Sequence, residues 1–314
     1  MLCTALPHTN LVGIQPKISF GSKINLPAIF LFGAIMSYKT ILVHVDQSPH
    51  AAARIEIAAK IAIAENAHLI GAAMSGISQF LYQENSLGIT GPVIDNQINA
   101  FYESCNIALA EFERIAKEIG VLSFEKRLLD DDAEGGLVLQ ARYSDLVVVS
   151  QTDSEDSFSR LITDLPEYVV LNSVRPVLIV PYAGRFEPLA RRILVAWDGS
   201  MEATRAITNA LPLLKKSQCV TLAVFNPSAR LNVHGEQPGA DIALFLTRHG
   251  VKVDVLAQQT YIDIGNTLLS LSSDLGSELI VMGGYGHARF REMLLGGATN
   301  TVLKTMTVPV LMSH

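Results

Sequence analysis

The sequence contains the same order of predicted strands and helices twice. Residues 39–48, KTILVHVDQS, align with residues 191–200, RRILVAWDGS, at an offset of 152. Residues 145–150, DLVVVS, align with residues 278–283, ELIVMG, at an offset of 133. Because the offset changes once along the chain, we interpret the sequence as a tandem duplication whose first copy has 19 extra residues.

Short apolar runs alternate with helical periodicity in both copies. Residues 41–45 form a β-branched run, and residues 51–66 repeat apolar side chains at helical spacing. At the offset of 152 the second strands also align, with residues 69–73 on residues 221–225. Strands that alternate with helices form a parallel sheet with helices on both faces. The sequence therefore predicts two tandem, doubly wound α/β domains.

The domain boundaries follow from the repeat. We expect the extra residues of the first copy at 76–97, in a loop that leads into a long helix over 96–120. The predicted organisation is a leader at 1–36, a first domain at 37–183, a linker at 184–190 and a second domain at 191–314.

The leader differs in character from the rest of the chain. Its apolar stretch, residues 26–36, is far shorter than the roughly 20 residues of a membrane helix. A second methionine, Met36, directly precedes the first predicted domain. We interpret residues 1–36 as disordered or spuriously translated, with a weak targeting segment as the alternative.

Composition excludes several kinds of partner. The formal net charge is −6 and no dense run of Lys or Arg occurs, which argues against nucleic acid and anionic membrane. Cys3, Cys105 and Cys219 lie far apart without a CxxC pair, which indicates a reducing compartment and no disulfide framework or zinc site. We therefore expect a cytoplasmic protein.

A glycine-rich stretch near the C-terminus is the strongest candidate site. Gly283, Gly284 and Gly286 follow a predicted strand, and Gly296 and Gly297 stand before a helix-like segment. Glycine lets backbone N–H groups approach an anion, and a helix N-terminus adds unpaired donors. We interpret the stretch as a phosphate site, with a flexible strand-to-helix connection as the alternative.

The first copy lacks these glycines. At the offset of 133, side chains replace them: Ser150, Asp153, Thr163 and Asp164 stand at the positions of Gly283, Gly286, Gly296 and Gly297. Acidic side chains repel a polyphosphate, so only the second copy should bind one.

Asp198 is the candidate partner of the glycines. It follows the first strand of the second copy, and ligands of doubly wound sheets lie beyond the carboxyl ends of strands where the strand order reverses. There Asp198 can accept hydrogen bonds from an adenine amine or a ribose hydroxyl. The alternative role is capping the helix that starts near Met201, and for its counterpart, Asp46, capping is the preferred interpretation.

Other motifs are weaker. The stretch is neither a Walker A loop nor GxGxxG, since Arg289 stands at the third glycine position. Arg289 and its neighbours His287 and Arg291 either donate to phosphate oxygens or form a solvated loop face. The run Asp130–Asp132 suggests a metal site or, as we prefer, a helix cap.

These residues resemble the universal stress protein family of the tandem two-domain type, over about residues 39–314. ATP-binding members of that family carry G-x2-G-x9-G-[S/T] after their fourth strand, and Gly283, Gly286 and Gly296 match it. Gly297 departs from the pattern because it stands where the family has Ser or Thr, so a hydroxyl donor is missing. Thr299 lies close by.

The resemblance implies a fold, a ligand and a site. The implied fold is a three-layer sandwich, flavodoxin-like or adenine nucleotide alpha hydrolase-like, with the two copies paired through edge strands as a pseudo-dimer and with pairing between chains as an option. The implied ligand is ATP, or ADP or AMP, with Mg²⁺ as an accompanying option. The expected nucleotide-binding residues are Ala196, Asp198, Val224, Met282, Gly283, Gly286, Arg289, Gly296, Gly297 and Ala298.

The predicted function is nucleotide binding in a stress-response protein that acts by conformational or partner coupling. No positioned general base is visible, so we expect weak ATPase activity at most. One alternative is a slow ATPase or nucleotidyl-transfer enzyme on the same fold. The other is a nucleotide-independent interaction module that uses residues 76–97 to bind a partner or a small lipophile.

Overall fold

The computed structural model describes residues 37–86, 92–153, 165–184, 186, 191–227, 237–286 and 297–314, with side chains left out at 82–86 and 92–93. The residues from Met36 to His314 form one compact unit. The predicted leader lies outside the described residues, as does most of the predicted linker.

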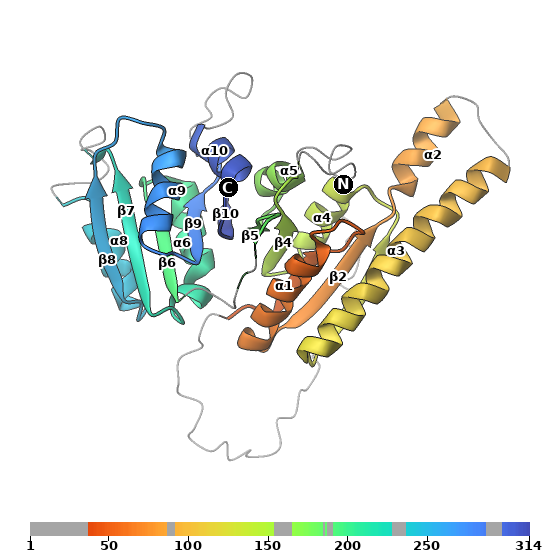
Figure 1. Cartoon of the computed structure of the whole chain (residues 1–314), viewed down its shortest axis with the longest axis horizontal. Coiled ribbons are helices and arrows are strands. Elements are labelled where there is room, and N and C mark those ends of the chain that lie inside the picture. The colour runs from red at the N-terminus through yellow and green to blue at the C-terminus, as the bar shows by residue number, and fades with distance from the viewer. Residues whose placement is uncertain are drawn as a thin grey trace, which may run out of the picture. The chain divides into compact units, whose positions relative to one another are not determined.

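The first ten elements make up the N-terminal half of this unit (Figure 1). In chain order they are β1 (Thr40–His44), α1 (Ala51–Glu65), β2 (His68–Met74), α2 (Ile77–Ser86), α3 (Pro92–Ile119), β3 (Phe124–Leu129), α4 (Ala133–Ala141), β4 (Leu146–Ser150), α5 (Leu165–Asn172) and β5 (Val177–Val180).

The remaining elements make up the C-terminal half. They are β6 (Arg192–Ala196), α6 (Met201–Leu214), β7 (Cys219–Phe225), α8 (Ala240–Arg248), β8 (Val253–Gln258), α9 (Ile264–Asp274), β9 (Leu279–Gly283), α10 (Gly297–Thr305) and β10 (Val310–Ser313).

All these strands belong to one sheet in the order β3-β2-β1-β4-β5-β10-β9-β6-β7-β8. Neighbouring strands are parallel except β5 and β10, which pair antiparallel with Leu178 opposite Leu311. One hydrophobic cluster joins the sheet to α1, α3, α6 and α8, and the other joins it to α4, α5, α9 and α10. Strands covered on both faces are apolar throughout, as in the fully buried run from Leu146 to Val149. The predicted doubly wound α/β fold is confirmed.

The register corrects one alignment of the sequence. Ile41 on β1 pairs with Leu69 on β2, and the counterpart of Ile41, Ile193, pairs with Val220 on β7. The structural counterpart of Leu69 is therefore Val220 and not Thr221. The fourth strands keep the offset of 133, because Ile41 pairs with Leu146 and Ile193 pairs with Leu279.

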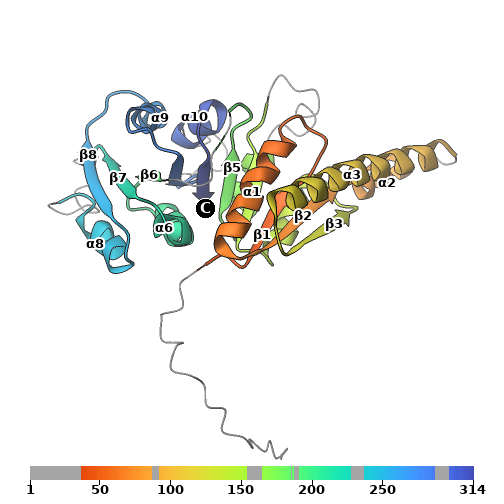
Figure 2. The same ribbon diagram turned by 60° about the horizontal axis from the view of Figure 1, so that its bottom comes forward.

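The extra residues of the N-terminal half lie between its second and third strands. Residues 75–123 separate β2 from β3, whereas only residues 226–252 separate β7 from β8, a difference of 22 residues. The predicted loop after residue 76 is wrong over most of its length, because residues 77–86 form α2. Figure 2 shows α2 running alongside the end of the long helix α3. Phe80 and Phe101 join the two helices in an edge-to-face contact with ring centroids 5.3 Å apart.

The two halves also meet through polar contacts and close packing. The Tyr38 hydroxyl donates to the carbonyl of Asn209 at 2.7 Å, and Lys216 forms an ion pair with the buried carboxylate of Glu65 at 2.6 Å. A Cβ at Gly284 would lie 2.7 Å from a methyl carbon of Val170 on α5, so this glycine packs directly against the other half.

No helix among the described residues combines the length and the apolar composition that a membrane span requires.

Candidate functional site

The crevice predicted from the sequence lies at the carboxyl ends of β6 and β9. These strands are adjacent and parallel, and the chain leaves β6 for β7 on one side and β9 for β10 on the other. Asp198 follows the end of β6 by two residues, and Gly283 ends β9. The structure therefore places Asp198 and Gly283 at the point where the strand order reverses, as a ligand crevice of this fold requires.

Gly283 is needed for packing as well as for ligand approach. A Cβ at this position would lie 2.6 Å from the backbone nitrogen of Ala203, in the first turn of α6. In the N-terminal half Ser150 takes the place of Gly283, and α1 begins at Ala51, the counterpart of Ala203 and two residues later than the start of α6. The absence of a side chain at 283 thus lets α6 begin earlier and reach the end of β9.

The capping roles considered for the two aspartates are wrong. The N-cap of α6 is Ser200, whose hydroxyl accepts from the Ala203 N–H at 3.1 Å, while Asp198 accepts from the Ser200 N–H at 3.0 Å. Asp198 therefore stabilises the turn that positions Ser200 as the N-cap of α6. Asp46 accepts from the Ser48 N–H in the same way, but the N-cap of α1 is His50, which makes no side-chain capping bond.

Two hydrogen bonds to β10 and α10 hold the described part of the glycine loop. The Gly284 N–H donates to the Ser313 carbonyl at 2.9 Å, and the Tyr285 N–H donates to the Thr299 hydroxyl at 3.3 Å. Tyr285 has a positive φ of 59°, a conformation uncommon for a residue with a side chain. Thr299 is buried and supports the loop, so it does not present its hydroxyl at the surface as the missing donor would.

The other expected site residues divide into three groups. Gly286 is exposed, and Gly297 and Ala298 form the first turn of α10. Ala196 is half-buried, whereas Val224 and Met282 have buried side chains, which leaves their backbones as the groups nearest a ligand. Arg289 and Gly296 lie outside the described residues, as do His287 and Arg291.

Two carboxylates near the loop were not found by sequence reasoning. A Cβ at Gly286 would lie 3.0 Å from Oε2 of Glu202, and a Cβ at Gly297 would lie 3.6 Å from Oδ1 of Asp263. Asp263 also caps α9 through the Asn266 N–H at 2.9 Å. Glu202 stands at the helix start expected near Met201, whereas no helix start was expected at Asp263. Their charges oppose a polyphosphate at this end of the crevice.

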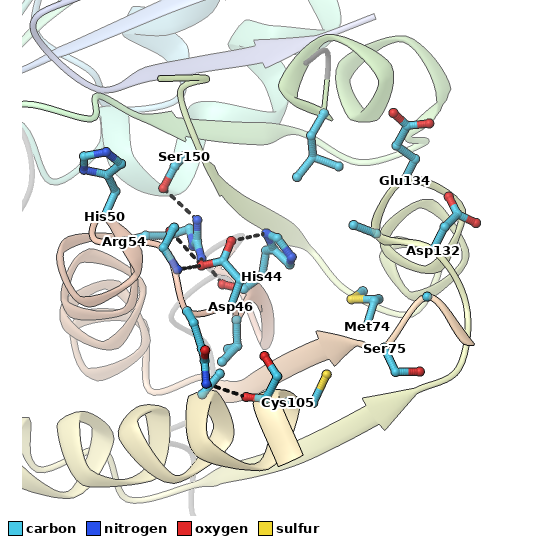
Figure 3. Close-up of a pocket in the computed structure, with 18 of the residues that line it drawn as sticks. His44, Asp46, His50, Arg54, Met74, Ser75, Cys105, Asp132, Glu134 and Ser150 are labelled. Atoms are coloured by element: carbon cyan, nitrogen blue, oxygen red, sulfur yellow. Dashed lines mark hydrogen bonds and ion pairs between the residues drawn. The ribbon is translucent and has the colours of Figure 1, made fainter. Parts of the chain in front are cut away.

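The equivalent position in the N-terminal half is filled by a buried arginine. Arg54 on α1 donates from Nε to the His44 carbonyl at 2.7 Å, from Nη1 to the Ser150 hydroxyl at 2.7 Å and from Nη2 to Asp46 at 2.9 Å (Figure 3). Nearby, His50 contacts Asp153, the counterpart of Gly286, at 3.0 Å. The side chains of Ser150 and Asp153, with their partners Arg54 and His50, thus lie where the C-terminal half has glycine.

Burial and charge set the ionisation of this cluster. Burial lowers the pKa of His44 to about 4 against the opposing attraction of Asp46, so the imidazole is neutral at pH 7. Burial alone would raise the pKa of Asp46, but the charges of Arg54 and His44 and the hydrogen bonds from Ser48 and Arg54 together outweigh it and hold that pKa well below its usual range. Asp46 and Arg54 therefore form an ion pair at neutral pH.

A cavity of about 460 Å³ adjoins this cluster, at the carboxyl ends of β1, β2 and β4. Asp132 on its rim caps α4 by accepting from the Gly135 N–H at 3.0 Å, as the preferred interpretation of Asp130–Asp132 held. No group of three metal-ligating side chains occurs in the described ranges.

A protein-family model matches the C-terminal half of the chain. The model is that of the universal stress protein family, and it matches residues 190–314. These residues belong to the universal stress protein family. A search of curated protein sequences gives no match for the chain.

Solved structures with the same fold extend over both halves. A universal stress protein from Archaeoglobus fulgidus DSM 4304 is 18% identical, with a TM-score of 0.64, and the similarity covers 87% of this chain and 94% of that one. A functionally unknown protein from Pseudomonas aeruginosa PAO1 is 14% identical, with a TM-score of 0.54, over 88% of this chain and 93% of that one. The universal stress protein domain at 190–314 thus lies in a chain whose two halves together follow a known architecture.

The pKa of His44 predicts a loss of stability in mild acid. The unfolded chain binds a proton to this imidazole near pH 6.5, whereas the folded chain binds it only near pH 4. The free energy of unfolding should therefore be fully retained above pH 6.5 and fall by about 3 kcal/mol as the pH drops to 4. Urea unfolding of the wild type and of His44→Asn across this range measures the effect.

The matched control is His68→Asn, which removes a half-buried histidine on the neighbouring strand. The pH dependence should flatten in His44→Asn and persist in His68→Asn. Equal slopes for wild type and His44→Asn between pH 6.5 and 4 would contradict the assignment.

Proposed function

We propose that the chain binds ATP or a related adenine nucleotide in its C-terminal half, in the crevice between β6 and β9. The observation that carries the proposal is the convergence of Asp198, Gly283 and Gly286 at the strand-order reversal, with the first turn of α10 closing the glycine stretch. Glycine backbones and a helix N-terminus suit phosphate oxygens, and Asp198 suits an adenine or ribose donor. Membership of residues 190–314 in the universal stress protein family supports the choice of an adenine nucleotide.

The acidic side chains around the crevice influence which adenine nucleotide binds more tightly. Glu202 and Asp263 flank the two ends of the glycine stretch and repel phosphate groups. Mg²⁺ bound to the nucleotide would offset this repulsion for ATP, while AMP brings less charge to the same position. We therefore propose that ATP binding depends on Mg²⁺ and that AMP binding does not.

The proposed mode of action is coupling between the two halves of a cytoplasmic stress-response protein. The last carbonyls of a helix lack partners within the helix, and in α10 the Leu303 carbonyl accepts from Gln151 of the N-terminal half at 2.9 Å. Gly284, at the start of the loop, packs on Val170 of the same half. A nucleotide that repositions the loop and α10 would change both contacts, which supports a conformational signal rather than turnover.

Calorimetric titration of ATP, ADP and AMP into the chain tests the proposal. We expect one site per chain, with Mg²⁺ strengthening the binding of ATP. In Gly286→Asp a second carboxylate would stand beside Glu202, so nucleotide affinity should fall at least tenfold. Gly286 is a better target than Gly283, whose substitution would also disturb the packing of α6.

The matched control is Thr247→Asp, which adds the same charge to the exposed face of α8. This variant should bind as the wild type does. Absence of binding to the wild type would refute the site, and two nucleotides per chain would refute its restriction to the C-terminal half.

Gly297 gives a second prediction. The position has room for a side chain, and the family carries a hydroxyl there, so Gly297→Ser should add one hydrogen bond to a phosphate oxygen. A net gain near 1 kcal/mol corresponds to about fivefold tighter binding. Gly297→Ala supplies the Cβ without the hydroxyl and should bind within about twofold of the wild type. Equal affinities of the Ser and Ala variants would exclude a phosphate contact at this position.

Coupling predicts that Gln151→Ala changes nucleotide affinity from the opposite half of the chain. Loss of the bond to the Leu303 carbonyl should loosen the end of α10 and weaken binding by up to about fivefold, since one neutral hydrogen bond contributes about 1 kcal/mol. The control is Gln140→Ala, whose side chain bonds Arg127 within the N-terminal half. Unchanged affinity in Gln151→Ala, measured by the same calorimetry, would refute transmission through this contact.

A further inference from the structure

A histidine that was not among the expected site residues holds the carbonyl of Gly284 in the glycine loop. His314 follows β10, and its ring atom Nδ1 lies 3.0 Å from this carbonyl oxygen. A carbonyl oxygen can only accept a hydrogen bond, so Nδ1 carries a proton and donates it. In the neutral ring, Nε2 is then without a proton. The contact therefore fixes the tautomer of His314.

The peptide group between Gly284 and Tyr285 is bonded at both of its polar atoms. Its carbonyl accepts from His314, and its N–H donates to the Thr299 hydroxyl at 3.3 Å. One partner follows β10 and the other lies on α10. Turning this peptide over would break both bonds, so the two side chains together hold it in one orientation.

This orientation directs the Gly284 carbonyl away from the crevice. In the sheet, β10 and β6 flank β9 on opposite sides. The carbonyl is bonded on the β10 side, whereas the crevice lies on the β6 side. Two residues further on, a Cβ at Gly286 would lie 3.4 Å from Oγ of Ser200, at the start of α6. A reversed peptide would turn a carbonyl oxygen towards the crevice, where its partial negative charge repels phosphate.

The N-terminal half has the same backbone contact at the end of its fourth strand. At the offset of 133, Gln151 corresponds to Gly284 and Val180 to Ser313. The Gln151 N–H donates to the Val180 carbonyl at 2.7 Å, as the Gly284 N–H donates to the Ser313 carbonyl at 2.9 Å. This backbone bond therefore belongs to the fold that both halves share.

The two side-chain contacts do not belong to the shared fold. Pro181 stands at the position of His314, and Pro166 stands at the position of Thr299. The side chain of proline has no atom that donates or accepts a hydrogen bond, so neither residue can replace its counterpart. The half that lacks the phosphate glycines thus also lacks both side chains. His314 and Thr299 accompany the glycine loop and are not needed to build the sheet.

We propose that His314 is a positioning residue of the nucleotide site. Together with Thr299 it clamps the peptide that follows Gly284, and the backbone of Gly286 is left as the group beside the phosphate. The inference rests on the proposed function, because it concerns the affinity of the same site. Since β10 also pairs with β5, the clamp ties the loop to the strand pair that joins the two halves.

NMR of the full chain, labelled with ¹⁵N, tests the contact in the absence of nucleotide. The nitrogen shifts of an imidazole report whether its proton is on Nδ1, on Nε2 or on both. At about pH 9, where imidazoles are neutral, His314 should carry its proton on Nδ1. The spectrum of His314→Asn assigns the signal. A neutral ring protonated on Nε2 would overturn the proposal.

Calorimetric titration of ATP with Mg²⁺ into two variants of matched shape tests the role in binding. His314→Asn retains a donor, because the amide nitrogen of Asn and the Nδ1 atom of His are both two bonds beyond Cβ. His314→Leu has nearly the shape of Asn and no donor. Affinity should fall about fivefold in His314→Leu, the effect of one neutral hydrogen bond, and stay within about twofold of the wild type in His314→Asn. Equal affinities of the two variants would overturn the proposal.

A double-mutant cycle tests whether the two side chains act on one peptide. Thr299→Val removes the hydroxyl at the other end of the peptide and keeps the size of the side chain. Loss of one bond already frees the peptide, so His314→Leu with Thr299→Val should bind within about twofold of the weaker single variant. A combined loss equal to the product of the two single losses would contradict a shared clamp and overturn the proposal.

The same titrations separate this inference from the proposed function. Absence of ATP binding to the wild type would refute the proposed function and, with it, the role of His314 in affinity, wherever the ring carries its proton. Binding to the wild type that is unchanged in His314→Leu would overturn the inference alone and leave the nucleotide site in place. The control is His68→Leu, which removes a histidine from β2 of the other half and should bind as the wild type does.

Discussion

The contact between the end of the fourth strand and the start of the first helix sets the space available in each half of the sheet. Gly283 has no side chain, so the first turn of α6 lies directly against the end of β9. Ser150 stands at the same position in the other half, where α1 begins two residues later. The guanidinium of Arg54 lies between the ends of β1 and β4 and donates to the Ser150 hydroxyl. One position in the strand therefore sets how closely the first helix of each half approaches the fourth strand.

Much of the fold could be predicted because its strands are buried on both faces. Runs such as Leu146–Val149 are apolar without interruption, and their order along the chain specifies a doubly wound sheet. The sequence alignment placed Leu69 on Thr221 instead of Val220 because an apolar run looks the same after a shift of one residue. Helix α2 was missed because its apolar residues, Ile77, Phe80 and Leu81, make up only one short stretch at helical spacing, next to residues read as a loop. In the structure Phe80 packs against Phe101 of α3.

The positions of Asp198 and Gly283 were predictable because strand ends and glycines mark them, whereas side chains that arrive from other elements were not. Asp198 and Gly283 lie where the sequence placed them, at the ends of adjacent strands. Arg54 was not singled out, because a lone arginine on an otherwise apolar helix face gives no sign of its partners. The carboxylates of Glu202 and Asp263 were overlooked for a similar reason, since acidic residues at helix starts are common for stability alone.

The two halves differ in how charge is arranged at corresponding places in the sheet. In the C-terminal half, exposed backbone at Gly286 and the start of α10 favours an anion, although Glu202 limits how much charge the crevice accepts. In the N-terminal half, the guanidinium of Arg54 is paired with Asp46 and bonded to Ser150, so it does not present a free positive charge to an anion. Because a unit charge near the surface interacts by several kcal/mol at contact distance, the sign of the unbalanced charge discriminates between ligands more strongly than differences in apolar shape. A phosphate group is therefore expected beside the backbone of Gly286 and not beside the ion pair of Arg54 with Asp46.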